Sequence, residues 1–265
     1  MREKGFFEVS ELAVATQRIL MIVPVPVPDV ALPGFAAQIP PELIRPDIAI
    51  DFIGCRNGAN LIDSPYEQTL ADAWVLDAGA RAEDQGYAAV CVNSMSDSGL
   101  AALRSRLSIP VVGPGRASFF LAADLGKTFS VLTMWKRWHS LYEKLALDTG
   151  LGNRLASIRD IDIRPDTAEL LAGKEDIVFA KLEQQARKAI DEDGADVVIL
   201  GSTTMHQSAT WLASRIEVPV LNPGLVAFKL CETLIDLGLA HSKKTYFAPE
   251  TTQDGLLDPV PVLFA

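Results

Sequence analysis

The sequence predicts an α/β protein of two doubly wound, parallel-sheet lobes, related by a pseudo-two-fold axis, with a ligand cleft between them. Apolar strand-like runs alternate with helix-like segments along the chain, which is typical of parallel sheets covered by helices. One strand-turn-helix-strand pattern also occurs twice, with residues 86–94 matching 194–202 and residues 109–115 matching 218–224. We therefore expect Ser94 and Ser202, which occupy equivalent positions, to face each other across the cleft.

Composition narrows the classes of function. The 265 residues are 49% hydrophobic and 22% charged, enough for two lobes with their own cores. A net charge of −10 without a basic cluster argues against a nucleic-acid partner. The long apolar run 19–32 is interrupted by three prolines and predicts no membrane partner. With no signal-peptide layout and three unpaired cysteines, we expect a cytoplasmic homo-oligomer that acts on a small-molecule substrate.

The elements of the first half follow from periodicity. Residues 1–17 form a loose or helical extension, and alternating prolines make 24–28 an extended loop. Helical spacing in 66–85 places Leu70, Trp74, Leu76 and Ala80 on the buried face. Ser96 or Asp97 is expected to cap the helix 97–107. Strands are predicted at 18–23, 48–54, 88–93 and 109–113.

The second half repeats this layout after a crossing helix at 116–125. The helix 135–148 is stopped by Gly150, 164–174 is a loop or short helix, and alternating charge makes the strand 156–163 an edge. Further strands are expected at 129–133, 197–200 and from Val218, with helices at 176–192, 206–215 and 224–239. Residues 1–115, completed by 224–265, are expected to form the first lobe, and 116–223 the second.

The two serine turns are the candidate site. In the second repeat the buried strand 197–200 runs into Gly201 and then Ser202, and ligands of open α/β sheets bind beyond the strand ends. Amides and hydroxyls of Met95, Ser96, Thr203 and Thr204, at two expected helix starts, could hold a carboxylate or an enolate-like oxygen. The alternative is that these Ser and Thr side chains only cap helices.

Three segments resemble the aspartate/glutamate/hydantoin racemases, most closely the hydantoin branch. They are Ser-Met-Ser-Asp-Ser-Gly-Leu at 94–100, Ile-Pro-Val-Val-Gly at 109–113 and Leu-Gly-Ser-Thr-Thr-Met at 200–205. The resemblance implies a cofactor-independent enzyme that moves a proton at carbon on a small carboxylate or cyclic amide. Two family cysteines, one on each face of the substrate carbon, correspond to Ser94 and Ser202. We expect neither a metal nor an organic cofactor, because no ligand cluster or Gly-x-Gly-x-x-Gly pattern is present.

Both serines depart from the family pattern. A hydroxyl is a poor base unless another group activates it, whereas a thiol can be tuned to a thiolate. His206, directly after the second turn, could supply that base or simply occupy a helix's first turn. Thr133, at the end of a strand that matches the family in kind, and Asn222, at the end of the short repeated strand, are further candidates for substrate contact. Val23-Pro24-Val25 replaces the family's Asn-Pro-Asn, which indicates a less polar cleft wall.

Other hypotheses about the function remain open at this point. A chain without the first cysteine is close to decarboxylases or lyases of the arylmalonate type. Loss of both thiols also suits a non-catalytic small-acid-binding module, or serines introduced in place of cysteines. A serine hydrolase using Ser202 and His206 lacks the Gly-x-Ser-x-Gly motif.

Overall fold

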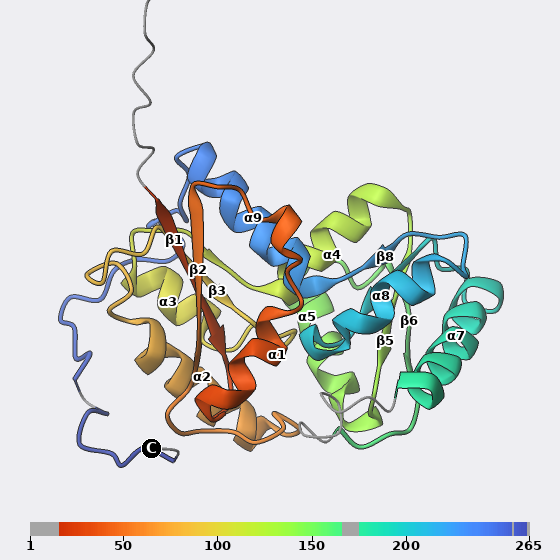
Figure 1. The fold of residues 1–265 in the computed structure, drawn as a ribbon, viewed down its shortest axis with the longest axis horizontal. Helices are drawn as coiled ribbons and strands as arrows, with labels where there is room; N and C mark the ends of the chain where they lie inside the picture. The colour runs from red at the N-terminus through yellow and green to blue at the C-terminus, as the bar shows by residue number, and fades with distance from the viewer. Residues whose placement is uncertain (1–15, 166–174, 256, 264–265) are drawn as a thin grey trace, which may run out of the picture.

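The computed structural model describes residues 16–165, 175–255 and 257–263, which form two α/β lobes side by side (Figure 1). Each lobe contains a four-stranded parallel sheet, and the two strand orders are equivalent: β2-β1-β3-β4 and β6-β5-β7-β8. The predicted fold class, two pseudo-symmetric lobes, is confirmed. The expected extension falls outside the described residues up to residue 15, as does the segment 166–174.

The strands agree closely with the periodicity of the sequence. In the first lobe they are β1 (Gln17–Val23), β2 (Ile48–Gly54), β3 (Ala89–Val92) and β4 (Val111–Val112). In the second they are β5 (Phe129–Thr133), β6 (Leu155–Asp160), β7 (Val197–Leu200) and β8 (Val220–Leu221). β3 and β7 are fully buried central strands, which explains their continuous apolar runs.

The helices cover both faces of each sheet. Those of the first half are α1 (Leu32–Ala36), α2 (Pro65–Gly79), α3 (Leu100–Arg106) and α4 (Pro114–Leu125). Those of the second half are α5 (His139–Thr149), α7 (Glu175–Asp191), α8 (His206–Ala213) and α9 (Pro223–Asp236). Gly150 ends α5 in the left-handed conformation, as expected.

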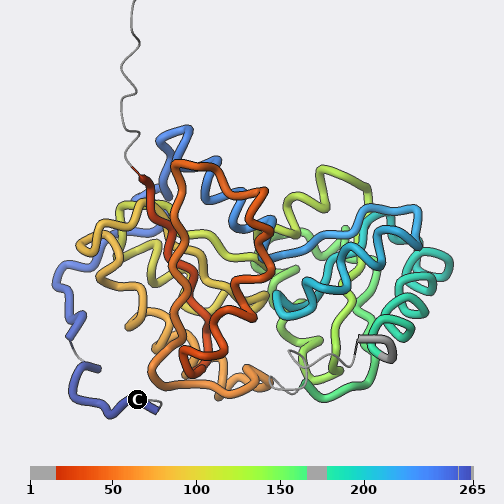
Figure 2. The backbone as a smooth tube through the Cα atoms, viewed as in Figure 1, coloured from red at the N-terminus to blue at the C-terminus, as the bar shows by residue number. Residues whose placement is uncertain are grey.

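Two helices are exchanged between the lobes. α4 follows β4 of the first lobe, yet Phe119 on α4 packs with Phe129 and Val131 of the second sheet. α9 follows β8 of the second lobe, yet its Phe228 packs with Met21 of the first sheet. α4 and α9 also contact each other, and the chain returns to the first lobe before its C-terminal tail (Figure 2). Domain boundaries at residues 115 and 223 remain a proposal that this exchange supports.

The buried face of α2 differs from the prediction. Ala71, Val75 and Gly79 are buried, whereas Leu70, Trp74 and Leu76 are only partly so; among the predicted residues Ala80 is buried. The reason is close packing, because a Cβ at Gly79 would lie 2.9 Å from side-chain atoms of both Ile22 and Leu103. Small residues therefore face the sheet, and the larger side chains lie along the helix flanks.

The predicted cap of the helix 97–107 is also wrong. α3 begins only at Leu100, because the preceding turn places Asp97 at φ 50°. The Asp97 carboxylate instead accepts hydrogen bonds from the backbone N–H groups of Gly115 (2.9 Å) and Arg116 (2.7 Å). These groups lie in the first turn of α4, so Asp97 joins the loop after β3 to the exchanged helix.

Candidate active site

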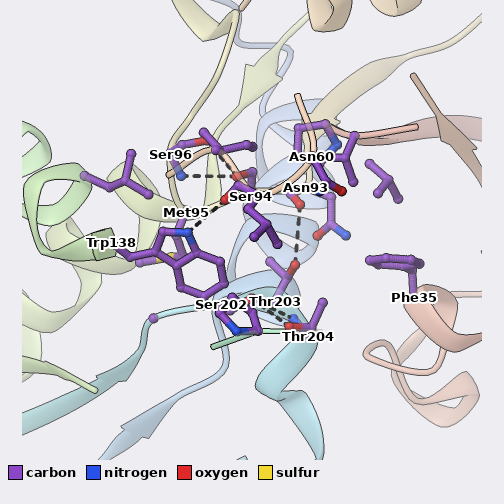
Figure 3. A pocket seen from close by; sticks show the side chains of 18 of the residues that line it. Phe35, Asn60, Asn93, Ser94, Met95, Ser96, Trp138, Ser202, Thr203 and Thr204 are labelled. Atoms are coloured by element: carbon purple, nitrogen blue, oxygen red, sulfur yellow. Dashed lines mark hydrogen bonds between the residues drawn. The ribbon is translucent and has the colours of Figure 1, made fainter. Parts of the chain in front are cut away.

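The two repeated serines line one small pocket between the lobes. β3 leads through Asn93 to Ser94 and β7 leads through Gly201 to Ser202, so both serines lie at the carboxyl ends of central strands. The pocket has a volume of about 100 Å³. Figure 3 shows Ser94 on one side of this space and Ser202 on the other. The geometry expected from the repeat is present.

The serine hydroxyls have matching surroundings in the two lobes. Ser94 Oγ accepts the backbone N–H of Ser96 (3.2 Å) and lies 2.7 Å from its hydroxyl. Ser202 Oγ accepts the backbone N–H of Thr204 (3.2 Å) and lies 2.8 Å from that hydroxyl. An N–H aimed at each Oγ stabilises negative charge developing on that oxygen. In the first lobe the chain of hydroxyls continues from Ser96 to Ser98 (2.7 Å).

The pocket wall is largely apolar and carries no charge among the described residues. Val23, Pro24 and Val25 form part of it, as the departure from the family's polar segment suggested. Trp138 is fixed in the wall by donating Nε1–H to the Leu61 carbonyl (2.8 Å). Tyr142 is the titratable residue of the wall, and burial raises its pKa above the ordinary value. Its hydroxyl donates to the Gly201 carbonyl (2.6 Å), so the lining is neutral at physiological pH.

Asn93 is a pocket residue that the sequence pattern did not single out. Its side chain is 2% exposed, and neither Oδ1 nor Nδ2 has a hydrogen-bond partner in the described protein. Buried amide atoms are normally satisfied, so an unpaired carboxamide at a pocket indicates a ligand contact. The available signal was the break in the repeat, where Asn93 stands opposite Gly201 in the otherwise matching segment.

With this pocket described, comparison with known proteins identifies the family. The profile described as Asp/Glu/Hydantoin racemase matches residues 32–231. This chain belongs to the Asp/Glu/hydantoin racemase family. It is 32% identical over 212 residues to a hydantoin racemase of Pseudomonas sp. (strain NS671), covering 78% of this chain and 82% of that one.

Similarity to solved structures supports the same family assignment. An allantoin racemase from Klebsiella pneumoniae matches with a TM-score of 0.83 and 27% identity, covering 93% of this chain and 99% of that chain. An allantoin racemase from Pseudomonas fluorescens matches with a TM-score of 0.80 and 30% identity, covering 89% and 99%. By family this chain is a racemase-type enzyme, an isomerase.

Most of the predicted site residues of this racemase-family chain converge on the pocket. Those that line it are Ser94, Met95, Ser96, Ser202, Thr203 and Thr204. Thr203 also links the lobes, since its hydroxyl donates to the Asn93 carbonyl (3.4 Å). Met95 and Ser96 were expected to hold an anion at a helix start. They do not lie at one, because α3 begins at Leu100 and the Ser96 amide donates to Ser94 Oγ. The catalytic and binding roles remain proposals.

Three predicted residues do not line the pocket of this racemase fold. Thr133 is buried behind it, with its hydroxyl 2.9 Å from that of Tyr142. His206 Nδ1 lies 3.3 Å from the Thr203 carbonyl, and burial lowers the pKa of the imidazole below its ordinary value. Asn222 donates from Nδ2 to the Gln38 carbonyl (3.4 Å). Each of the three lies beside a pocket-lining segment or behind it. A position at a strand end does not by itself tell whether a side chain lines the pocket or lies next to its lining.

The cysteines and possible metal ligands lie elsewhere. Cys55, Cys91 and Cys231 are buried and none lines the pocket, and burial raises the pKa of the Cys55 thiol to about 12. Over the described ranges, no three His, Cys, Asp or Glu side chains are grouped as metal ligands. A helix long and apolar enough to cross a membrane is likewise absent from the part of the chain that was placed.

Proposed function

We propose that this racemase-family chain holds a small, uncharged cyclic amide of the hydantoin type between Ser94 and Ser202, and transfers a proton at the ring carbon between them. The observation that carries the proposal is the unpaired Asn93 carboxamide in a neutral pocket. A carboxamide presents one donor and one acceptor side by side. A cyclic amide presents the complementary N–H and C=O along one ring edge, so two parallel hydrogen bonds fix the ring's orientation.

The neutral wall favours a cyclic amide over an acid. A carboxylate buried in this pocket would lack a cationic partner, and an unpaired buried charge is strongly unfavourable. A malonate carries two carboxylates and would fit less well than a ligand with one. The neutral wall therefore disfavours the decarboxylase alternative. Hydantoin racemase and allantoin racemase, the names of the relatives, also denote action on compounds that contain a hydantoin ring.

The proposed chemistry depends on the two serine oxygens. Each Oγ is held by the N–H of the residue two positions later and faces the pocket from its own lobe, so a ring between them offers one face to each. Asn93 Nδ2 would donate to the ring oxygen on which charge develops when the carbon loses its proton. For the transfer to balance, one Oγ first loses its proton to water; the resulting alkoxide takes the ring proton, and the opposite hydroxyl returns its own proton to the other face of the carbon. A serine hydroxyl gives up its proton far less readily than a thiol, so proton transfer is expected to be slow in this chain.

Binding and deuterium exchange together test the proposal. Calorimetric titration with hydantoin and phenylmalonate should show binding of hydantoin alone. NMR in deuterated water should show enzyme-dependent exchange of the ring proton of an enantiopure 5-substituted hydantoin, with loss of optical rotation. Tighter binding of phenylmalonate would contradict the proposal.

A second function rests on the same neutral wall. Because no pocket side chain in the described structure has a pKa near neutrality, a module that binds cyclic amides without turning them over is the alternative. Saturable hydantoin binding without exchange above the protein-free rate would establish that function and exclude racemisation.

A further inference from the structure

A second, larger cavity lies beside the reaction pocket. It has a volume of about 500 Å³ and lies between α2, α3, α4 and α5. The loop after β3 separates the two spaces, and Ser96 and Leu141 line both. Unlike the reaction pocket, this cavity is lined by charged side chains: Asp72, Asp97, Arg104, Arg116, Lys144 and Asp148.

Two arginines of this cavity lack an ionic partner in the described structure. Arg104 is 7% exposed, and it donates to the Val111 carbonyl (3.0 Å) and the Tyr246 hydroxyl (3.1 Å). Arg116 donates to the Asp148 carbonyl (3.4 Å). All of these acceptors are neutral, whereas a buried guanidinium such as that of Arg104 is ordinarily paired with an anion. Arg116 is partly exposed. Burial, with a smaller contribution from repulsion by Arg116, lowers the pKa of Arg104.

The acidic residues of the cavity are already engaged. Asp97 directs both carboxylate oxygens at backbone N–H groups of α4, and Asp72 accepts the N–H of Gly99 (2.7 Å). Asp148 pairs with Lys144 one helical turn away. The charges of the lining are balanced in number, three acidic against three basic, and Asp97 attracts both arginines from a distance. None of the three carboxylates, however, accepts a hydrogen bond from the guanidinium group of Arg104 or Arg116, so these groups keep donors for a ligand in the cavity.

We propose that this second cavity binds a small monocarboxylate through Arg104 and Arg116. The Ser98 hydroxyl, which also lines the cavity, adds a neutral donor or acceptor beside them. The ligand carries a single charge, because Asp72, Asp97 and Asp148 disfavour a second negative charge in the same space. The same acids favour a ligand with N–H donors near its carboxylate. This site is separate from the proposed reaction at Ser94 and Ser202.

Calorimetric titration of the full chain with N-acetylglycine, acetate and inorganic phosphate tests this site. N-acetylglycine should bind more tightly than acetate and phosphate. Arg116→Gln should weaken N-acetylglycine binding about tenfold or more, the usual effect of losing a charge-assisted hydrogen bond. Arg154→Gln is the matched control, because Arg154 also donates to one backbone carbonyl (3.2 Å) but lies outside the cavity.

The controls separate this site from the reaction pocket. Asn93→Ala should leave N-acetylglycine binding unchanged, and Arg116→Gln should leave hydantoin binding unchanged. The proposal would be overturned if N-acetylglycine did not bind. It would also be overturned if Arg116→Gln and Arg154→Gln lost equal affinity for N-acetylglycine, or if Asn93→Ala lost that affinity. Phosphate binding more tightly than N-acetylglycine would overturn the monocarboxylate assignment. None of these outcomes depends on racemase activity.

Discussion

Replacing Asn93 by alanine should weaken ligand binding without destabilising the protein. Two neutral hydrogen bonds to a cyclic amide contribute about 1 kcal/mol each, so their loss should raise the Kd for hydantoin about 30-fold. In the described protein neither side-chain amide atom of Asn93 has a protein partner, so alanine removes no protein hydrogen bond. The Tm should therefore stay close to that of wild type.

Calorimetry with hydantoin and thermal unfolding of the same variants measure both effects. Asn93→Asp keeps the shape but removes the N–H donors, and it should also bind hydantoin weakly. Asn222→Ala is the matched control, because Asn222 also ends a strand and has an unpaired Oδ1 but does not line the pocket. Unchanged hydantoin affinity in Asn93→Ala, together with a lowered Tm, would show that Asn93 has a structural role and does not bind the ring.

Three further predictions follow from individual contacts. Gly201→Ala should lower the free energy of unfolding by about 1–3 kcal/mol, because a Cβ there would lie 2.7 Å from the Tyr142 hydroxyl. Gly152→Ala is the control and should leave the free energy of unfolding unchanged, because a Cβ there would lie no closer than 4.0 Å to another atom. Burial raises the pKa of Asp97 from 3.8 to about 6, so the stabilisation from its protonation is present below pH 3.8 and is lost as pH rises through about 6. Urea unfolding should therefore show wild type losing about 2 kcal/mol relative to Asp97→Asn between pH 4 and 7, and parallel pH profiles would contradict this. Alanine at any one of the three cysteines should leave ring-proton exchange per folded molecule unchanged, because no thiol lines the pocket, and a large loss of exchange would disprove that assignment.

The repeat made the site's framework predictable. If two duplicated lobes are related by a two-fold axis around one cleft, equivalent strand ends face that cleft, so Ser94 and Ser202 could be placed in one pocket from the repeat. The returning helix α9 was predictable for the same reason, because its counterpart α4 also follows a short fourth strand.

Contacts distant in sequence were not predictable. The segment around Asp97 has the composition of a helix cap, and its actual partners lie 18 and 19 residues later in α4. The small buried face of α2 depends on how closely the helix approaches β1. Asn93 was overlooked because a strand-end asparagine has ordinary structural roles, and only the absence of a partner distinguishes it.

Comparing ring-proton exchange in wild type and in the double variant Ser94→Cys/Ser202→Cys tests whether residues 94 and 202 move the proton. In the double variant the two sulfurs would take the places of Ser94 Oγ and Ser202 Oγ, which now accept the N–H groups of Ser96 and Thr204. One sulfur would then lie on each side of the ring. A few per cent of a typical thiol is thiolate at pH 7, far more than the ionised fraction of a serine hydroxyl. Exchange should be at least tenfold faster in the double variant, with hydantoin affinity within about threefold of wild type. Equal exchange rates would contradict proton transfer by the residues at 94 and 202, because another group would then move the proton.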